Sequence, residues 1–182
     1  MNLHVSTVTR RIVAAAAVTC AAALAPAAAL ASSGPHPGAR TATASCATSG
    51  LDVWLDTQGS GAAGTTYYFL NFTNLSGSTC TLFGYPGVSG VTLSGTQIGS
   101  AASRSGSSPA TVTLANGATT HALVGIVNAG VISPSQCHPV TAAGLRVYPP
   151  NQTKSRVAPF PFTACSKNGP TYLTIGPVGF PA

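Results

Sequence analysis

Few residues in this sequence could do chemistry, since it holds two carboxylate side chains and four histidines. Beyond the first thirty-one residues, the candidates are Asp52, Asp56, His36, His121 and His138. Asp52 and Asp56 share one face of a predicted strand, which places their Cα atoms about 13 Å apart at about 3.3 Å per residue. That separation is larger than the one that paired-carboxylate glycosidases use.

The spacing of these residues along the sequence predicts neither a nucleophilic site nor a metal site. The sequence has no G-x-S-x-G elbow, and neither His121 nor His138 has a carboxylate close to it along the chain. Scattered histidines make a weak metal-binding set. A modest net charge and predicted export argue against nucleic-acid binding. We therefore predict a protein without catalysis, cofactor or metal ion; a secreted hydrolase or a protease-inhibitor-like protein with an unrecognised site stays the alternative.

Three aromatic residues are the candidates for a binding surface. Trp54 shares the face of Asp52 and Asp56, while Tyr67 and Phe69 point away from the expected buried side of their strand. If the two strands are neighbours, these aromatics form a surface beside two acids that would suit a sugar of a cell-wall polymer or another secreted protein. The favoured alternative is that a second layer covers them as core, because large aromatic side chains are usually well buried.

The elements that position these residues are predicted to be short strands. Residues 51–56 alternate strictly, with aliphatic side chains on the face opposite Trp54. The densest run of aromatic and β-branched residues follows, and its two halves, 65–74 and 80–93, are predicted to form a hairpin around an Asn/Ser/Gly turn. The expected buried face of the first half comprises Tyr68, Leu70 and Phe72.

The rest of the chain continues the β pattern. Asn116-Gly117 predicts a hairpin between residues 111–114 and 119–127. Residues 128–143 are expected to be a loop, because Pro134 and Pro139 disfavour regular pairing. Further strands are predicted at 145–148, weakly near 156–157, in the proline-interrupted segment 160–162, and at 172–175. Without any sustained helical period, the pattern predicts an all-β, Ig-like or Greek-key β-sandwich of about eight short strands.

Four cysteines remain outside the N-terminal stretch: Cys46, Cys80, Cys137 and Cys165. An even set in an exported chain predicts two disulfides, for which three pairings exist, and no C-x-x-C spacing suggests zinc. If 51–56 and 65–74 run antiparallel, Cys46 and Cys80 lie at the same end. The same reasoning for 145–148 and 156–162 brings Cys137 towards Cys165.

The N-terminal stretch has the features of a secretory signal. Arg10 and Arg11 precede an apolar run at 12–30, and Ala29-Leu30-Ala31 predicts cleavage before Ser32. A membrane anchor, a twin-arginine signal and a lipidated Cys20 are the minor alternatives. Residues 32–45 are predicted to be a flexible tether and 46–182 the domain. The mature chain then has 151 residues, a net charge of +4, no membrane span and a secreted or envelope-associated location.

Several motifs resemble a known family. They are Phe72-Thr73-Asn74, the segment from Cys80 to Val88, Leu145-Arg146-Val147-Tyr148-Pro149-Pro150, and the four cysteines around them. Together they are similar to the domain-of-unknown-function family numbered 4232, which is common among secreted proteins of actinobacteria. The resemblance covers roughly residues 46–176 and implies a small β-sandwich, exported or tethered to the cell envelope. It implies no active-site residue.

Overall fold

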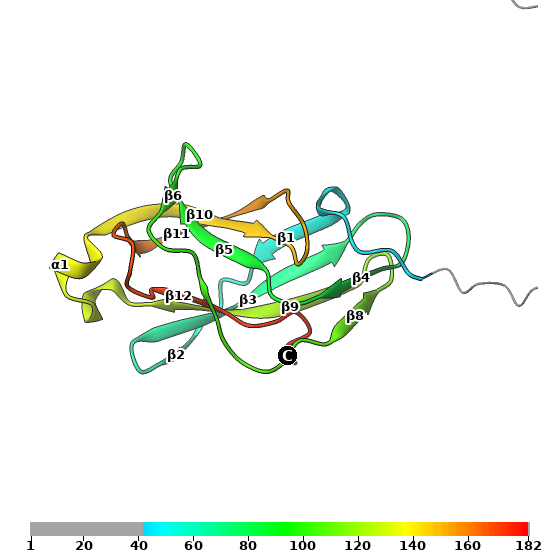
Figure 1. Cartoon of the computed structure of the whole chain (residues 1–182), viewed down its shortest axis with the longest axis horizontal. Coiled ribbons are helices and arrows are strands. Elements are labelled where there is room, and N and C mark those ends of the chain that lie inside the picture. Colours follow the sequence, from blue (N-terminus) through cyan, green and yellow to red (C-terminus); the bar gives the residue numbers. More distant parts are fainter. Residues whose placement is uncertain (1–41, 182) are drawn as a thin grey trace, which may run out of the picture. The chain divides into compact units, whose positions relative to one another are not determined.

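Two β-sheets pack face to face within residues 42–181, the part of the chain that this computed structural model describes (Figure 1). The larger sheet has six strands. Its order is β1 (Leu51–Leu55), β3 (Thr65–Asn74), β9 (Thr119–Val127), β12 (Leu173–Ile175) and β7 (Ser103–Arg104), with β2 (Ser60–Ala62) paired to β3. All of its pairs are antiparallel except that of β12 with β7.

The opposing sheet has four strands, β11 (Arg156–Cys165), β10 (Pro139–Tyr148), β5 (Gly87–Val91) and β6 (Gln97–Ile98), in that order. A third, two-stranded sheet joins β4 (Cys80–Phe83) to β8 (Thr111–Leu114). The helical turns are short: η1 (Thr48–Gly50), η2 (Ala129–Val131) and α1 (Pro134–Cys137). The expectation of an all-β sandwich is therefore confirmed.

The inner faces carry the aliphatic and aromatic core. On β1 the alternation follows the prediction, because Leu51, Val53 and Leu55 are buried while Asp52 and Trp54 are exposed. On β3, Leu70 and Phe72 are fully buried. Tyr68 is half-buried and packs edge-on against Phe160 of the opposing sheet, with 4.9 Å between ring centroids.

The predicted hairpin between residues 65–74 and 80–93 is wrong. β3 pairs with β1 and β9, whereas β4 pairs with β8 in another sheet. The cause is the fully buried side chain of Asn74, whose Nδ2 donates to the carbonyls of Ser78 (2.8 Å) and Leu114 (2.9 Å). These bonds fix the connection as a crossing between sheets.

The Asn116-Gly117 turn forms, but the hairpin predicted from it is wrong as well. The turn is closed by a bond from the Ala118 N–H to the Ala115 carbonyl, and Gly117 has a φ of 82°. It leads from β8 into β9, which belong to different sheets. The Gly117 N–H donates to the Asn74 carbonyl, and Asn116 Oδ1 accepts from the Gly77 N–H at 2.8 Å. The two turns therefore brace each other.

Two proline-containing segments form more strand than predicted. β10 begins at Pro139, inside the expected loop, and β11 runs unbroken from Arg156 to Cys165 through Pro159 and Pro161. β11 is an edge strand, so a proline without an N–H costs less there. A register shift opposite Ala142 to Gly144 accommodates the remaining mismatch.

The predicted disulfides are confirmed, with Cys46 bonded to Cys80 and Cys137 to Cys165. The first joins the entrance of the domain to β4, where the Ala44 carbonyl also accepts a hydrogen bond from the Thr81 N–H (2.9 Å). The predicted signal and most of the predicted tether lie outside the described residues. Among residues 42–181, no helix has the length and apolar character needed to cross a membrane.

Candidate functional site

The outer side of the six-stranded sheet carries the residues that the sequence singles out. Pairing register places Trp54 of β1 opposite Asn71 of β3, and Asn71 opposite His121 of β9. We call the outward positions within residues 52–56, 67–73 and 119–125 of these strands the Trp54 face. Its members are Asp52, Trp54, Asp56, Tyr67, Phe69, Asn71, Thr73, Thr119, His121, Leu123 and Gly125.

The two acids stand in the rows on either side of Trp54. Asp52 pairs with Thr73, and Asp56 donates its backbone N–H to the Phe69 carbonyl at 2.8 Å. The side chain of Asp56 accepts a hydrogen bond from the backbone N–H of Gln58 at 3.0 Å, so the following loop orients its carboxylate. Asp52 is exposed and Asp56 half-exposed. The face therefore presents negative charge on both sides of one indole.

Trp54 is 44% exposed, the most open aromatic residue of this face. Its Nε1–H reaches Thr73 Oγ1 at 3.4 Å, and that hydroxyl is hydrogen-bonded to the hydroxyl of Thr119 at 2.9 Å. Thr73 of β3, itself bonded to Thr119 of β9, thus orients the indole. A ring held in one orientation loses less conformational entropy when a ligand stacks on it.

Tyr67 is half-buried on the same face because Gly125 makes room for it. The two residues are paired across β3 and β9, and a Cβ atom at position 125 would lie 3.0 Å from Tyr67 Cε1. The ring therefore lies over the glycine backbone. A Cβ at this position would come closer still to Thr174 Oγ1, so any side chain would require Thr174 as well as the ring to shift.

Phe69 and His121 form the third aromatic group of the face. Their ring centroids are 4.6 Å apart, and Phe180 approaches Phe69 at 6.3 Å. The C-terminal segment is held here because the Gly179 and Phe180 N–H groups both donate to the His121 carbonyl, at 3.0 and 3.2 Å. His121 Nε2 is buried and has no hydrogen-bond partner among the described residues.

The three predicted aromatics consequently share one face but stand in successive rows, each with different neighbours. Trp54 lies beside the threonines, Phe69 beside His121 and Tyr67 over Gly125. Sequence reasoning missed Phe180, because the stretch after residue 175 has no periodicity from which its position could be predicted. The hairpin predicted between residues 111–114 and 119–127 also gives His121 the wrong neighbouring strand, because His121 pairs with Asn71 of β3.

The arrangement does not bring an acid to the histidine. Asp52 lies on β1 and Asp56 directly follows that strand, while His121 lies on β9, two strands away in the sheet. At about 4.8 Å per strand spacing, their backbones are roughly 10 Å apart. His138 is exposed, adopts a left-handed conformation (φ 47°) at the end of α1, and gives its carbonyl to Ser166. Residues 42–181 contain no group of three His, Cys, Asp or Glu side chains placed to share a metal ion.

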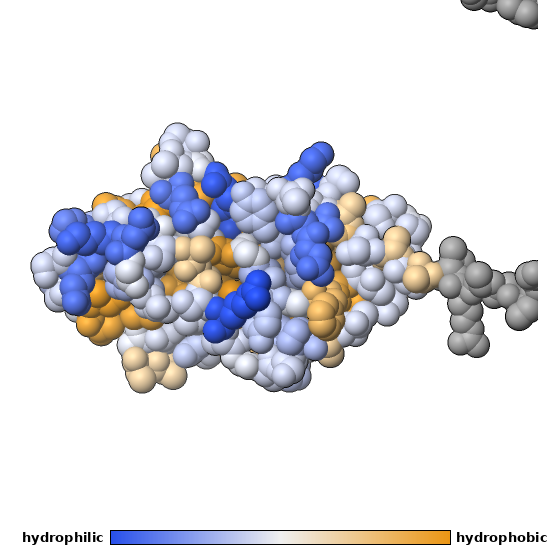
Figure 2. All heavy atoms as spheres, in the orientation of Figure 1, coloured by the Kyte–Doolittle hydropathy of each residue, from blue (hydrophilic) through white to orange (hydrophobic). Residues whose placement is uncertain are grey.

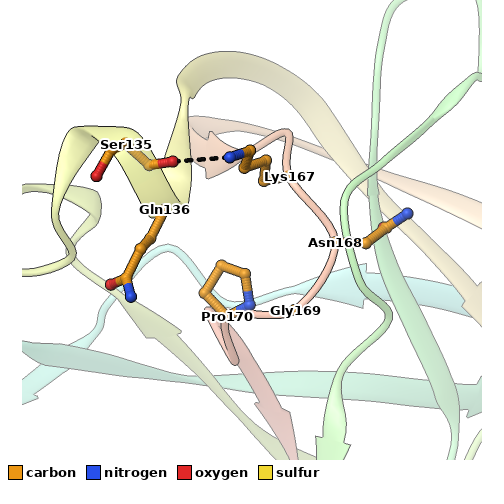
Figure 3. A pocket seen from close by; sticks show the side chains of 6 residues that line it. All are labelled: Ser135, Gln136, Lys167, Asn168, Gly169 and Pro170. Atoms are coloured by element: carbon orange, nitrogen blue, oxygen red, sulfur yellow. Dashed lines mark hydrogen bonds between the residues drawn. The ribbon is translucent and has the colours of Figure 1, made fainter.

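A polar hollow of about 440 Å³ lies elsewhere, between α1 and the loop that follows β11 (Figure 3). Its single cation is Lys167, whose Nζ donates to the Ser135 carbonyl at 3.0 Å. The remaining lining residues are Ser135, Gln136, Asn168, Gly169 and Pro170. None of the six is acidic or a histidine, so the hollow offers no acid–base pair.

A second hollow, of about 620 Å³, lies on the outer side of the four-stranded sheet beneath the turn that joins β5 to β6. The guanidinium of Arg146 donates to the Gly95 carbonyl and holds this turn over the sheet. Leu93, at the edge of the hollow, is 98% exposed. In Figure 2 the strongly hydrophilic residues of the visible face stand in separate groups.

Comparison with known proteins adds a family. The model of the family described as "Domain of unknown function (DUF4232)" matches residues 46–179, which is more than half of the chain. No curated protein and no solved structure matches.

Proposed function

The chain belongs to the DUF4232 family, and from that premise we propose that it is an exported, non-catalytic binding module that acts at the cell envelope or outside the cell. Two disulfides support export, since such bonds persist in oxidising compartments. The observation that carries the binding role is Trp54, a large aromatic side chain left 44% exposed on the outer side of a sheet.

An exposed and oriented indole is suited to recognition. Its apolar surface gains free energy when a partner covers it, and the threonine pair under its N–H keeps the ring in place. The flanking rows add polar groups that can select the partner. A cell-wall polymer with a stacking sugar face and another exported protein are the two kinds of partner that this chemistry accommodates.

The non-catalytic part of the proposal rests on the separation of the titratable groups. A hydrolytic site needs a nucleophile, a base and an orienting group within hydrogen-bond reach of one another. The row that contains His121 offers Asn71 and Trp54 instead, and both acids lie two strands away. Because these groups are too far apart to act together in catalysis, we assign a binding role to this surface.

The test is capture of partners by the protein purified as its host produces it. The immobilised protein is incubated with peptidoglycan, wall polysaccharide and the proteins of its own culture medium, and the retained material is quantified. We expect Trp54→Ala to reduce retention of the partner at least about fivefold, the equivalent of about 1 kcal/mol.

The matched control is Leu93→Ala, which removes a fully exposed apolar side chain from the turn between β5 and β6 of the other sheet. It should leave retention unchanged. Equal retention by the wild type and Trp54→Ala, with both folded by circular dichroism, would contradict the proposed function.

A further inference from the structure

Every carboxylate side chain of this sequence stands beside Trp54. The chain has eight Lys and Arg residues and two acids, Asp52 and Asp56, and both acids lie on the Trp54 face. Asp52 lies two residues before the indole, and Asp56 lies two residues after it. A negative surface on a basic protein is a feature that a partner of opposite charge would recognise.

The five basic residues of the described chain lie outside this face, and four of them are engaged by other groups. Arg156 donates to the carbonyls of Thr48 and Ser49, and Arg104 lies over the ring of Tyr85 at 5.4 Å. None of the eleven positions of the Trp54 face holds Lys or Arg. The Trp54 face therefore contains no cationic side chain from the described part of the chain.

The spacing on β1 points to the form of the partner. Alternate residues of a strand are about 6.6 Å apart. Asp52 and Trp54 lie on β1, and Asp56 continues its line with a backbone bond to Phe69, so the three present acid, indole and acid at that repeat. An extended peptide places its own alternate side chains at the same interval. A lysine or arginine in the middle of such a peptide would meet the indole face, where cation–π attraction adds to the two ion pairs.

We propose that the Trp54 face binds an extended segment of a partner protein that carries Lys or Arg at every second position. The outer two cations pair with Asp52 and Asp56, and the middle one lies on Trp54. This inference rests on the proposed function and names the class of partner for the same face. An amine-bearing polysaccharide has the same charge, but its repeat is not that of a strand.

The probe is an acetylated and amidated peptide in which three lysines alternate with serines. Matched peptides carry glutamine or glutamate in place of each lysine. Trp54 is the only tryptophan of the chain, so its intrinsic fluorescence reports occupancy of this face directly. We expect saturable binding of the lysine peptide at concentrations up to about 1 mM, weaker binding of the glutamine peptide and none of the glutamate peptide.

The decisive variant is D52N/D56N, which keeps the shape of both side chains and removes their charge. We expect its affinity for the lysine peptide to fall at least about tenfold, and wild-type affinity to fall with added salt as exposed charges are screened. The control S107K/T113K raises the net charge by the same amount at two exposed positions outside the six-stranded sheet. It should lower affinity less than twofold.

Three outcomes would overturn the inference: equal binding of the three peptides, unchanged affinity of D52N/D56N, or tighter binding of an amine-bearing oligosaccharide than of the lysine peptide. None of these would contradict the proposed function if Trp54→Ala still reduced capture of the natural partner. Conversely, capture that does not depend on Trp54 would contradict the proposed function whatever the peptides show.

Discussion

The Trp54 face and the hollow beside Lys167 differ in whether their functional groups are bonded within the protein or open to solvent. On the face, Trp54 uses only its N–H, towards Thr73, and leaves much of its ring open. In the hollow, the single ammonium donates to the Ser135 carbonyl and so stabilises the chain itself. In the hollow, the charged group is therefore used in a bond within the protein. On the Trp54 face, the aromatic ring stays open to a partner.

This difference indicates that concavity is a poor guide to the recognition site in this small β-sandwich. The hollow results from the way α1 and the loop after β11 meet at the Cys137–Cys165 disulfide. The face results from strict alternation along strands whose other side is core. A residue that alternation directs outward and that packing does not need is a better candidate for recognition than a residue that lines a gap.

The largest effect should come from the inner side of the same sheet. Phe72 is fully buried on β3, whereas Trp54 is open on neighbouring β1. Phe72→Ala should lower the free energy of unfolding by about 3–5 kcal/mol, because it removes a large core side chain and leaves a cavity. Trp54→Ala should cost less than about 1.5 kcal/mol. Urea unfolding of both variants measures the difference, and similar losses would mean that the indole is part of the core.

An intermediate effect is expected at Tyr172, close to the hollow in sequence but built into the core. Its hydroxyl donates to the Ile98 carbonyl at 2.6 Å, and burial raises the pKa of the phenol to about 12 from 10. Because the folded state holds this proton more tightly than the unfolded chain does, the stabilisation is complete below pH 10. It is lost as the pH rises through about 12.

The expected loss from this group is about 2 kcal/mol across that interval. Unfolding by urea at a series of pH values, under conditions in which the disulfides stay intact, measures it. Tyr172→Phe keeps the ring and removes the titrating group, so its stability should decline less over the same interval. A parallel decline in both proteins would show that another group titrates.

Much of the candidate face could be predicted from the sequence, because strand alternation is a local property. It placed the two acids and Trp54 on one side of residues 51–56 without any knowledge of the sheet. The disulfides could be predicted for a related reason, since each depends on one pair of antiparallel strands, which the structure contains.

The second neighbour of β3, strand β9, could not be predicted, because a buried side chain helps to decide it. Asn74 looks like an ordinary turn residue in the sequence, and only the fold shows that its amide joins Ser78 to Leu114. Separately, Asn116-Gly117 predicts a hairpin of β9 with β8, which conceals the pairing of His121 with Asn71. The sequence also predicts that the prolines interrupt β11, because their tolerance depends on the strand being at a sheet edge, which only the fold shows.

The smallest effect should come from Lys167, and it sharpens the contrast between the two regions. Lys167→Met keeps much of the length of the side chain and removes the ammonium that donates to the Ser135 carbonyl. The bond is exposed to solvent, where such interactions contribute little, so the free energy of unfolding should change by no more than about 0.5 kcal/mol. Capture of the natural partner should equal that of the wild type, while Trp54→Ala, assayed alongside, loses it. If Lys167→Met lost capture with unchanged stability, the hollow would be the recognition site and the ranking of the two regions would be reversed.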